Sequence, residues 1–321
     1  MYLCGSYGFD IDSFMINRVL IRLKVVQIIY AYYQNGGGKI ASADRELSLS
    51  LNSAYSLYHN LLYLFVAVWR HSCKTIVKIQ KLEMERVPRK ELLFSENRFF
   101  AQLAENTELN QCIQPEDMTW IAESGLLSSI YNKVLESEVL EEYLQEEKFD
   151  YDADKELCRK LYKSIFMDND ELESVFEGQN IYWNGDKSLI DSFILKTIKS
   201  FVEKNGADQK LQADYKDEND RKFSIDLLHA GLEAEEECRA IISELCQRWD
   251  PNRLAFIDVL IMQTAIAEML RFPEIPLKVT INEYVEMAKY LSTPNSGSFV
   301  NGMLDNIAKE LIEKGRITKT I

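Results

Sequence analysis

The chain has 321 residues, 46% of them hydrophobic, with only 13 Gly and 6 Pro. This length predicts about two domains, and the composition excludes a disordered chain and disfavours a turn-rich all-β fold. The longest apolar run, residues 61–69, is far shorter than the roughly 20 residues of a membrane-spanning helix, and residues 1–14 lack the basic start and apolar stretch of a secretory signal. We therefore expect an all-α, cytoplasmic protein without a membrane segment.

Charge is distributed unevenly along the chain, although the formal net charge is −14. Residues 15–80 carry eight Lys and Arg against two Asp and Glu, a net of +6, whereas residues 81–246 carry 20 against 38, a net of −18. The last segment, 247–321, carries nine of each. Such asymmetry can place a nucleic-acid-binding end inside an acidic protein, but an acidic middle is equally typical of a solvated helix surface.

No pattern in the sequence predicts a metal site or a cofactor. The six cysteines include no C-x-x-C pair, and none of the three histidines stands near a cysteine in a ligand spacing, so we expect reduced thiols. The chain also lacks the strand and glycine-rich loop that a nucleotide cofactor requires. The acidic residues of the middle have no His or Lys at a matching spacing, so we expect no enzymatic activity.

The first predicted helix covers about residues 16–34 and ends at three consecutive glycines, 36–38, whose backbone entropy opposes helix formation. A long apolar-periodic segment follows over about residues 43–84, and Pro88 marks a break after it. From about residue 96 to residue 222 the pattern remains helical with more frequent turns. The buried stripe of the first helix is predicted from the spacing of Val19, Leu23, Val26 and Tyr30.

One long helix is predicted over residues 223–249, and a second begins at Asp250-Pro251 and reaches Leu270. The Asp side chain accepts a hydrogen bond from a free amide, and Pro at the first helical position has no amide to lose. Pro273 and Pro276 then favour an extended stretch.

The last two helices are also marked by their ends. Thr280-x-x-Glu283 has the form of a capping box, residues 293–297 form a loop, and Gly315 is a candidate C-cap. The buried stripe of the final helix is predicted to contain Val300, Leu304, Ile307 and Leu311.

Several segments resemble the NusB family. The C-terminal series runs from Ile275-Pro276 through Ile281-Asn282-Glu283 to Ser298-Phe299-Val300-Asn301-Gly302. The N-terminal run is Arg18-x-x-x-Arg22-x-Lys24-x-x-Gln27-x-x-Tyr30, and segments 223–228 and 253–270 are also similar to the family. The likeness covers residues 15–35 and 223–315.

The resemblance implies a NusB-like helical bundle in two halves with a large helical insertion between them. We accordingly expect an N-terminal basic helical segment at 15–80, an acidic helical enlargement at 81–222 and a C-terminal NusB-like half at 223–321. The implied function is transcription antitermination: binding of boxA-like single-stranded RNA together with the ribosomal protein NusE, in support of ribosomal RNA transcription. Contacts with other Nus factors and with RNA polymerase are further expectations.

The implied RNA site draws on both ends of the chain. Arginine offers planar pairs of donors to phosphate, the start of the last helix presents free amides, and an aromatic ring there would stack on an unpaired base. The residues carried over from the resemblance are Arg18, Arg22, Lys24, Gln27, Ser296, Ser298, Phe299 and Asn301.

Structural interpretations stand beside these assignments. Two arginines four residues apart are usually a solvated helix edge, Phe299 can equally be a core aromatic, and Asn301 can bond the preceding loop. Gly302 is expected to allow close helix packing. The positions where the family meets its ribosomal-protein partner correspond to Glu268, Pro276 and Lys278.

Two other functions remain open at this point. The first is a protein-interaction adaptor that does not bind RNA, which the acidic middle and the sparse arginines favour. The second is an accessory domain of an RNA-modifying enzyme, since NusB-like domains also occur fused to such enzymes. The missing cofactor loop disfavours the second alternative.

Overall fold

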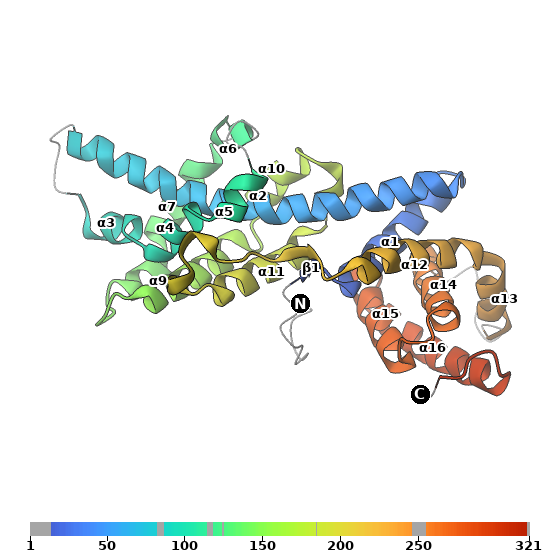
Figure 1. Ribbon diagram of the computed structural model, residues 1–321. Coiled ribbons are helices and arrows are strands. Elements are labelled where there is room, and N and C mark those ends of the chain that lie inside the picture. Colours follow the sequence, from blue (N-terminus) through green and yellow to red (C-terminus); the bar gives the residue numbers. More distant parts are fainter. Residues whose placement is uncertain are drawn as a thin grey trace. The chain divides into compact units, whose positions relative to one another are not determined.

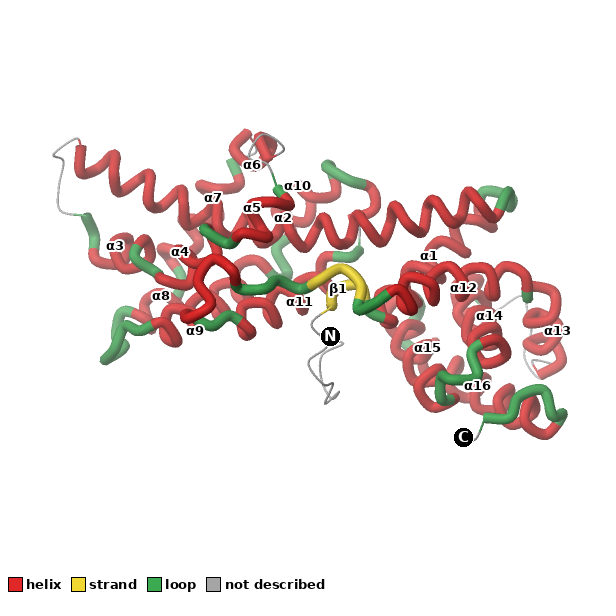
Figure 2. The backbone as a smooth tube through the Cα atoms, in the orientation of Figure 1, coloured by secondary structure: helices red, strands yellow, loops and turns green. Residues whose placement is uncertain are grey.

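The computed structural model describes residues 14–81, 87–113, 118–123, 125–183, 185–245 and 255–319 (Figure 1). Helices make up nearly all of their regular structure (Figure 2), which confirms the predicted all-α class. Two short strands, β1 (Phe14–Ile16) and β2 (Ala213–Tyr215), form a two-stranded sheet. None of the described helices is both long and apolar enough to cross a membrane. Residues 1–13, expected not to form a secretory signal, and the predicted helix start at 250–251 lie outside the described residues. Within them, the helix that reaches residue 270 begins at Phe256, after an extended Ala255.

The chain forms two compact units. Unit 1 contains residues 1–51 and 215–321, and unit 2 contains residues 52–214, so that unit 2 is inserted in sequence between two parts of unit 1. The helix α2 (Ile40–Lys81) belongs to unit 1 up to Leu51 and to unit 2 beyond it. This division differs from the predicted boundaries after residues 80 and 222, because the apolar face of the second half of α2 forms part of the core of unit 2.

Unit 1 is built around α14 (Phe256–Arg271), which is buried on every side from Leu260 to Met269. A helix that is buried on every side needs neighbours on all faces, and α14 contacts each of the other helices named below. These are α1 (Arg18–Gln34), α12 (Glu218–Glu233), α13 (Glu235–Leu245), α15 (Leu277–Leu291) and α16 (Ser296–Glu313).

The predicted first helix is confirmed as α1. The Asn17 side chain caps it by accepting hydrogen bonds from two amides of its first turn, and Gly36 and Gly37 adopt positive φ just beyond its end. The predicted buried stripe holds only in its middle: Leu23 and Val26 are buried, whereas Val19 is half-buried and Tyr30 is 40% exposed. There α1 is near its C-terminal end, and the Tyr30 ring lies 5.7 Å from that of Phe256, itself partly exposed.

The single long helix predicted from residue 223 is wrong within the described residues. The chain bends at Ala234, which separates α12 from α13. Glu235, Glu236 and Glu237 then occupy the first turn of α13, where the helix dipole favours negative charge. The bend therefore places three carboxylates at a helix start.

The capping box predicted at Thr280 and Glu283 is also wrong. Pro276 is the N-cap of α15, so Thr280 lies inside the helix, and its hydroxyl donates to Glu268 instead. The final helix follows the prediction: its four stripe residues are buried. Gly315 has φ +66 and its amide donates to the Ile312 carbonyl, as expected of a C-cap glycine.

Unit 2 has an aromatic core. The Phe65 ring of α2 lies 4.5 Å from Phe100, 5.3 Å from Tyr162 and 4.9 Å from Phe166, measured between ring centres. A π-helix, η2 (Tyr162–Phe166), directly follows α9 (Tyr151–Leu161) and stacks Tyr162 on Phe166. The other helices are α3 (Arg89–Ser95), α4 (Arg98–Ala104), α5 (Thr107–Cys112), α6 (Thr119–Glu123), α7 (Leu126–Glu136), α8 (Glu138–Tyr143), α10 (Asp170–Glu177), η3 (Ile181–Trp183), α11 (Lys187–Ser200) and η4 (Glu203–Asp208).

Candidate nucleic-acid interface

Arg18 lies at the start of α1 with its side chain partly exposed. Its Nε is 2.9 Å from Oδ1 of Asp220, and its guanidinium carbon lies 4.7 Å from the centre of the Phe223 ring. An ion pair of this kind contributes little to stability, and the guanidinium is positioned by both contacts. Arg18 can therefore offer its remaining donors to a ligand.

Arg22, one turn further on, is buried with 3% of its side chain exposed. Its Nε lies 2.7 Å from Oε2 of Glu268, and its Nη2 lies 3.0 Å from Oε1 of the same carboxylate. The two remaining contacts to this carboxylate come from α15: the Thr280 hydroxyl donates to Oε1 at 2.7 Å, and the Tyr284 hydroxyl donates to Oε2 at 3.2 Å. These four residues tie α1, α14 and α15 together, and Arg22 does not present its charge at the surface.

The pKa values of Arg22 and Tyr284 are shifted by burial and by the neighbouring charge of Glu268. Burial by itself would lower the pKa of Arg22, but the charge and hydrogen bonds of Glu268 outweigh burial and raise that pKa. Burial, followed by the negative charge of Glu268, raises the pKa of the Tyr284 hydroxyl well above its ordinary value. Arg22 thus stays charged and Tyr284 stays a donor across the physiological range.

The other two predicted residues of α1 do not extend the face that carries Arg18. Lys24 is buried, and Gln27 is half-buried. Gln27 follows Arg18 by nine residues, which is about two and a half turns of an α-helix, so the two side chains leave the helix on opposite sides. In this structure α1 therefore offers Arg18 to a ligand, with Gln27 on a different face.

Ser296, at the start of α16, has a structural role. Its side chain is buried, and its hydroxyl lies 2.8 Å from Oδ2 of Asp258 in α14 and 2.8 Å from the hydroxyl of Thr293. The amide of Thr293 also donates to this hydroxyl at 3.3 Å. Ser296 thus joins the loop before α16 to α14, and the carboxylate of Asp258 lies close to the start of α16.

The outward face of α16 carries the remaining predicted residues. Ser298 and Asn301 are exposed, and Phe299 is half-exposed, so Phe299 is not a fully buried core aromatic. Gly302 is exposed as well, and a Cβ added to it would meet nothing within 4 Å. Close packing against another helix, as expected for Gly302, is therefore wrong within the described residues, and the backbone there is open to approach from outside.

Lys289 is a cation near this face that the sequence reasoning missed. The side chain of this α15 residue passes over Gly297, where an added Cβ would come within 2.6 Å of the Lys289 Cγ. Its ammonium group lies 2.5 Å from a carboxylate oxygen of Glu286, and both side chains are exposed. The glycine before Ser298 was the available signal, because a glycine near a helix start can mark close approach of another group.

The three predicted partner-binding residues are divided between interior and surface. Glu268 is fully buried in the group described above, whereas Pro276 and Lys278 are exposed at the start of α15. Val279, the next residue, is 41% exposed. Glu268 is not itself accessible to a partner, and it holds Thr280 and Tyr284 of α15 as well as Arg22 of α1.

The predicted RNA-binding residues of α1 and those of α16 do not form one packed cluster, because the two helices pack mainly on other helices. α1 packs on α12 and α14, while α16 packs on α13, α14 and α15. The central helix α14 is their common neighbour and bonds to each, through Glu268 to α1 and through Asp258 to α16.

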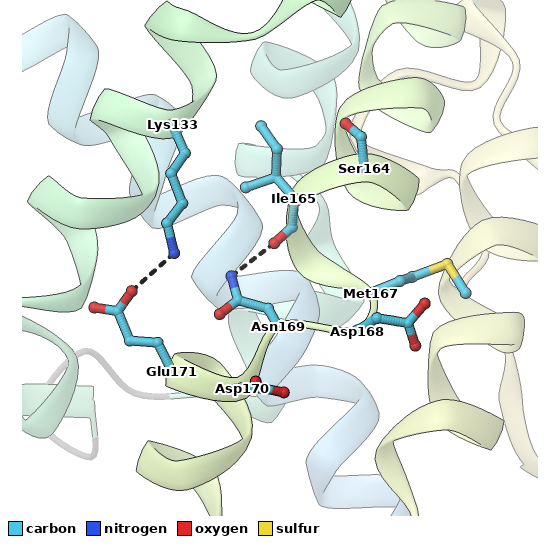
Figure 3. Close-up of a pocket in the computed structure, with 8 residues that line it drawn as sticks. All are labelled: Lys133, Ser164, Ile165, Met167, Asp168, Asn169, Asp170 and Glu171. Atoms are coloured by element: carbon cyan, nitrogen blue, oxygen red, sulfur yellow. Dashed lines mark hydrogen bonds and ion pairs between the residues drawn. The ribbon is translucent and has the colours of Figure 1, made fainter.

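A cavity of about 420 Å³ lies in unit 2, apart from all predicted site residues (Figure 3). Its polar groups are largely engaged with one another: Lys133 Nζ lies 2.9 Å from a Glu171 oxygen, and the Asn169 amide donates to the Ile165 carbonyl at 2.7 Å. Asp168 adopts φ +50 beside them. The acidic lining disfavours an RNA phosphate. In the part of the chain that the structure describes, no group of three or more His, Cys, Asp or Glu residues is placed to hold a metal ion.

Comparison with known proteins matches residues 189–309 to the model of the NusB family. Transcription antitermination protein NusB of Salinibacter ruber is 37% identical over 133 residues, which cover 40% of this chain and 83% of that protein. The NusB of Desulforapulum autotrophicum is 35% identical over 130 residues, covering 38% and 91% respectively. A solved structure of T. maritima NusB is 36% identical, covers 31% of this chain and 70% of its own, and has a TM-score of 0.29.

Proposed function

The chain belongs to the NusB family of transcription antitermination proteins, as an enlarged form, and we propose that it binds boxA-like single-stranded RNA together with the ribosomal protein NusE. In this proposal the protein supports transcription of ribosomal RNA in the cytoplasm, acts without enzymatic chemistry, and meets other Nus factors and RNA polymerase in the same assembly. The observation that carries the proposal is the open outward face at the start of α16.

That face combines three features suited to an unpaired strand. Phe299 offers a half-exposed ring for stacking, Ser298 and Asn301 offer exposed hydrogen-bonding groups, and Gly302 leaves the backbone accessible. The Lys289 ammonium, paired with Glu286, lies on the neighbouring helix beside it. We assign direct contact with RNA to these residues and to Arg18, with Gln27 as an outlying contact of α1.

Arg22, Lys24 and Ser296 act indirectly in this proposal. Arg22 is buried in its ion pair and Ser296 in the loop that leads to α16, so both position the elements that carry the contact residues. Lys24 is buried and supports α1 from within. For the ribosomal partner, we assign contact to Pro276, Lys278 and Val279, and a positioning role to Glu268.

The proposal is tested with a labelled boxA-like RNA, a scrambled RNA of equal length and purified NusE. Phe299→Ala should weaken binding of the boxA-like RNA by on the order of 1–3 kcal/mol through lost stacking, with little change in salt dependence. The matched control is Tyr182→Ala, which removes a half-buried aromatic side chain of unit 2. Lys278→Glu should reduce the gain in affinity that NusE provides and leave binding of RNA alone unchanged.

Equal binding of the two RNAs by the wild-type protein, or unchanged affinity of Phe299→Ala, would contradict the RNA site. If Phe299→Ala unfolds the protein, the ring belongs to the core, and Asn301→Ala then tests the same face. Unchanged NusE dependence in Lys278→Glu would exclude the assigned partner surface.

The adaptor alternative gains support from one observation, namely that two of the three cations assigned to α1 are buried. An adaptor would bind NusE without any measurable affinity for either RNA. The same titration therefore decides between the two functions.

A further inference from the structure

A group of basic residues lies at the far end of α2, within unit 2. From Leu47 to Lys81 this helix contains no Asp or Glu, and the next acidic residue is Glu83. The four basic residues of this stretch are Arg70, Lys74, Lys78 and Lys81. The rest of unit 2, residues 82–214, has 15 Lys and Arg against 29 Asp and Glu, a net of −14. This stretch of α2 therefore carries only positive charge, in a unit whose remaining residues are acidic overall.

These four side chains leave α2 on one face. At about 100° per residue they fall within an arc of roughly 80°. Residues four apart rise about 6 Å along the axis, so the row extends for about 16 Å from Arg70 to Lys81. The opposite face is buried in the aromatic and aliphatic core, through residues such as Leu61, Phe65 and Ile76. We call Arg70, Lys74, Lys78 and Lys81 the basic ridge.

The charges of the basic ridge are available to a ligand. Lys74, Lys78 and Lys81 are exposed, and none of them forms an ion pair with any residue that the structure describes. Arg70 is held more firmly, because its Nη2 donates to the Ala104 carbonyl at 3.0 Å and its guanidinium lies 5.9 Å from the Tyr63 ring. Burial, and after it the charges of Lys78 and Lys74, lowers the pKa of nearby His71.

We propose that the basic ridge of unit 2 binds the phosphate backbone of RNA without regard to base sequence. This proposal rests on the RNA-binding function proposed above and adds a second, electrostatic contact to it. A protein that neutralises phosphates gains affinity from the release of counterions, and this contribution does not depend on the bases. The basic ridge would thereby add phosphate contacts that are independent of base sequence.

The chemistry of the row favours a repeating polyanion over other acidic ligands. Lysine ammonium groups are mobile point charges, so a row of them follows a flexible chain of phosphates without demanding one geometry. The exposed apolar side chain within the row is Val77, which offers little area for insertion into lipid or for anchoring a peptide. RNA is also the polyanion to which the proposed function brings this protein.

The test is a salt titration of RNA binding by full-length Lys74→Gln/Lys78→Gln/Lys81→Gln. The control is Lys196→Gln/Lys199→Gln/Lys204→Gln, which removes three exposed lysines of the same unit with an equal change of net charge. Removing three phosphate contacts should lower the slope of log affinity against log salt by about two, since each contact to a single strand contributes roughly 0.7. We expect this decrease for boxA-like and scrambled RNA alike, and no decrease for the control.

Each outcome has one interpretation. Equal salt slopes in the ridge variant and the control would overturn the proposal. If Phe299→Ala binds the boxA-like RNA more weakly in the same experiments, the proposed function remains intact. If the ridge variant has a lower salt slope and Phe299→Ala keeps its RNA affinity, the results would support the basic ridge and contradict the RNA site on α16. Loss of binding to phosphatidylserine vesicles in the ridge variant, with unchanged RNA slopes, would identify a membrane surface instead and overturn the proposal.

Discussion

Arg22 and Glu268 are 246 positions apart in the sequence, yet they form a buried, two-point ion pair with both side chains almost fully enclosed. Charges removed from water in this way are costly when either partner is missing, because the remaining charge has no solvent and no counterion. Thr280 and Tyr284 use the other lone pairs of the carboxylate, so that the group is fully hydrogen-bonded. At the scale of residues, Arg22, which the sequence predicted as an RNA contact, thus holds helices together in the structure.

Replacing Arg22 by Met should lower the free energy of unfolding by about 3–5 kcal/mol, because Glu268 would stay buried without its counterion. Urea denaturation followed by circular dichroism measures this loss. Arg18→Met is the control, since its partly exposed pair with Asp220 should contribute no more than about 1 kcal/mol. Equal stability of Arg22→Met and the wild type would show that the pair does not hold α1 to α14.

At the scale of elements, the contact between α1 and α12 depends on one glycine. Gly231 of α12 faces Ile29 of α1, and a Cβ added to it would lie 2.6 Å from the Ile29 Cδ1. The Gln263 side-chain amide of α14 donates to the Gly231 carbonyl at 2.8 Å, which fixes the position of this backbone. The two helices can approach this closely because the glycine has no side chain.

Gly231→Ala should therefore destabilise the protein by about 1–3 kcal/mol through overpacking, and Ile29→Val should recover part of that loss by removing the clashing methyl group. Thermal unfolding of the two single variants and the double variant gives the coupling. Gly302→Ala is the matched control: its added methyl meets nothing, so alanine should stabilise α16 by roughly 0.5–1 kcal/mol. A neutral Gly231→Ala would mean that the Ile29 side chain, or the helix that carries it, moves aside at no cost.

At the scale of the whole molecule, the two units contain ionisable groups that respond differently to acid. In unit 2, burial lowers the pKa of His59 to about 4, although its hydrogen bond to the Tyr55 carbonyl acts in the opposite direction. In unit 1, burial raises the pKa of Glu283, with the charges of Arg22 and Glu268 nearby. The first group destabilises the fold when the pH falls, and the second does not.

Acidification should accordingly weaken unit 2. Between about pH 6.5 and 4 the unfolded state binds a proton at His59 that the folded state excludes, so stability present above pH 6.5 falls by up to about 3 kcal/mol as the pH decreases. Hydrogen exchange at pH 7 and pH 5 should show the loss of protection in residues 52–214. In His59→Gln this loss of protection between pH 7 and pH 5 should disappear. If the variant loses as much protection as the wild type, His59 is excluded as the cause.

Local sequence patterns were sufficient to predict those helix ends and buried faces that neighbouring residues determine. The glycines after α1, the stripe of α16 and its C-cap were predicted because backbone freedom and helical periodicity act over a few positions. The NusB motifs identified the family because they are contiguous. Thr280-x-x-Glu283 misled for the same reason: it has the capping pattern, but Pro276 begins the helix one turn earlier.

The sequence by itself thus determined the all-α class, most helices of unit 1 and the family. The tertiary structure decided which charged residues face the solvent: burial of Arg22 depends on Glu268, which a local pattern cannot indicate at a distance of 246 residues. It also placed the second half of α2, with the exposed Lys74, Lys78 and Lys81, in unit 2. Counting charged residues along a chain gives only their number. Burial and pairing between distant segments determine which of these charges are exposed to a ligand.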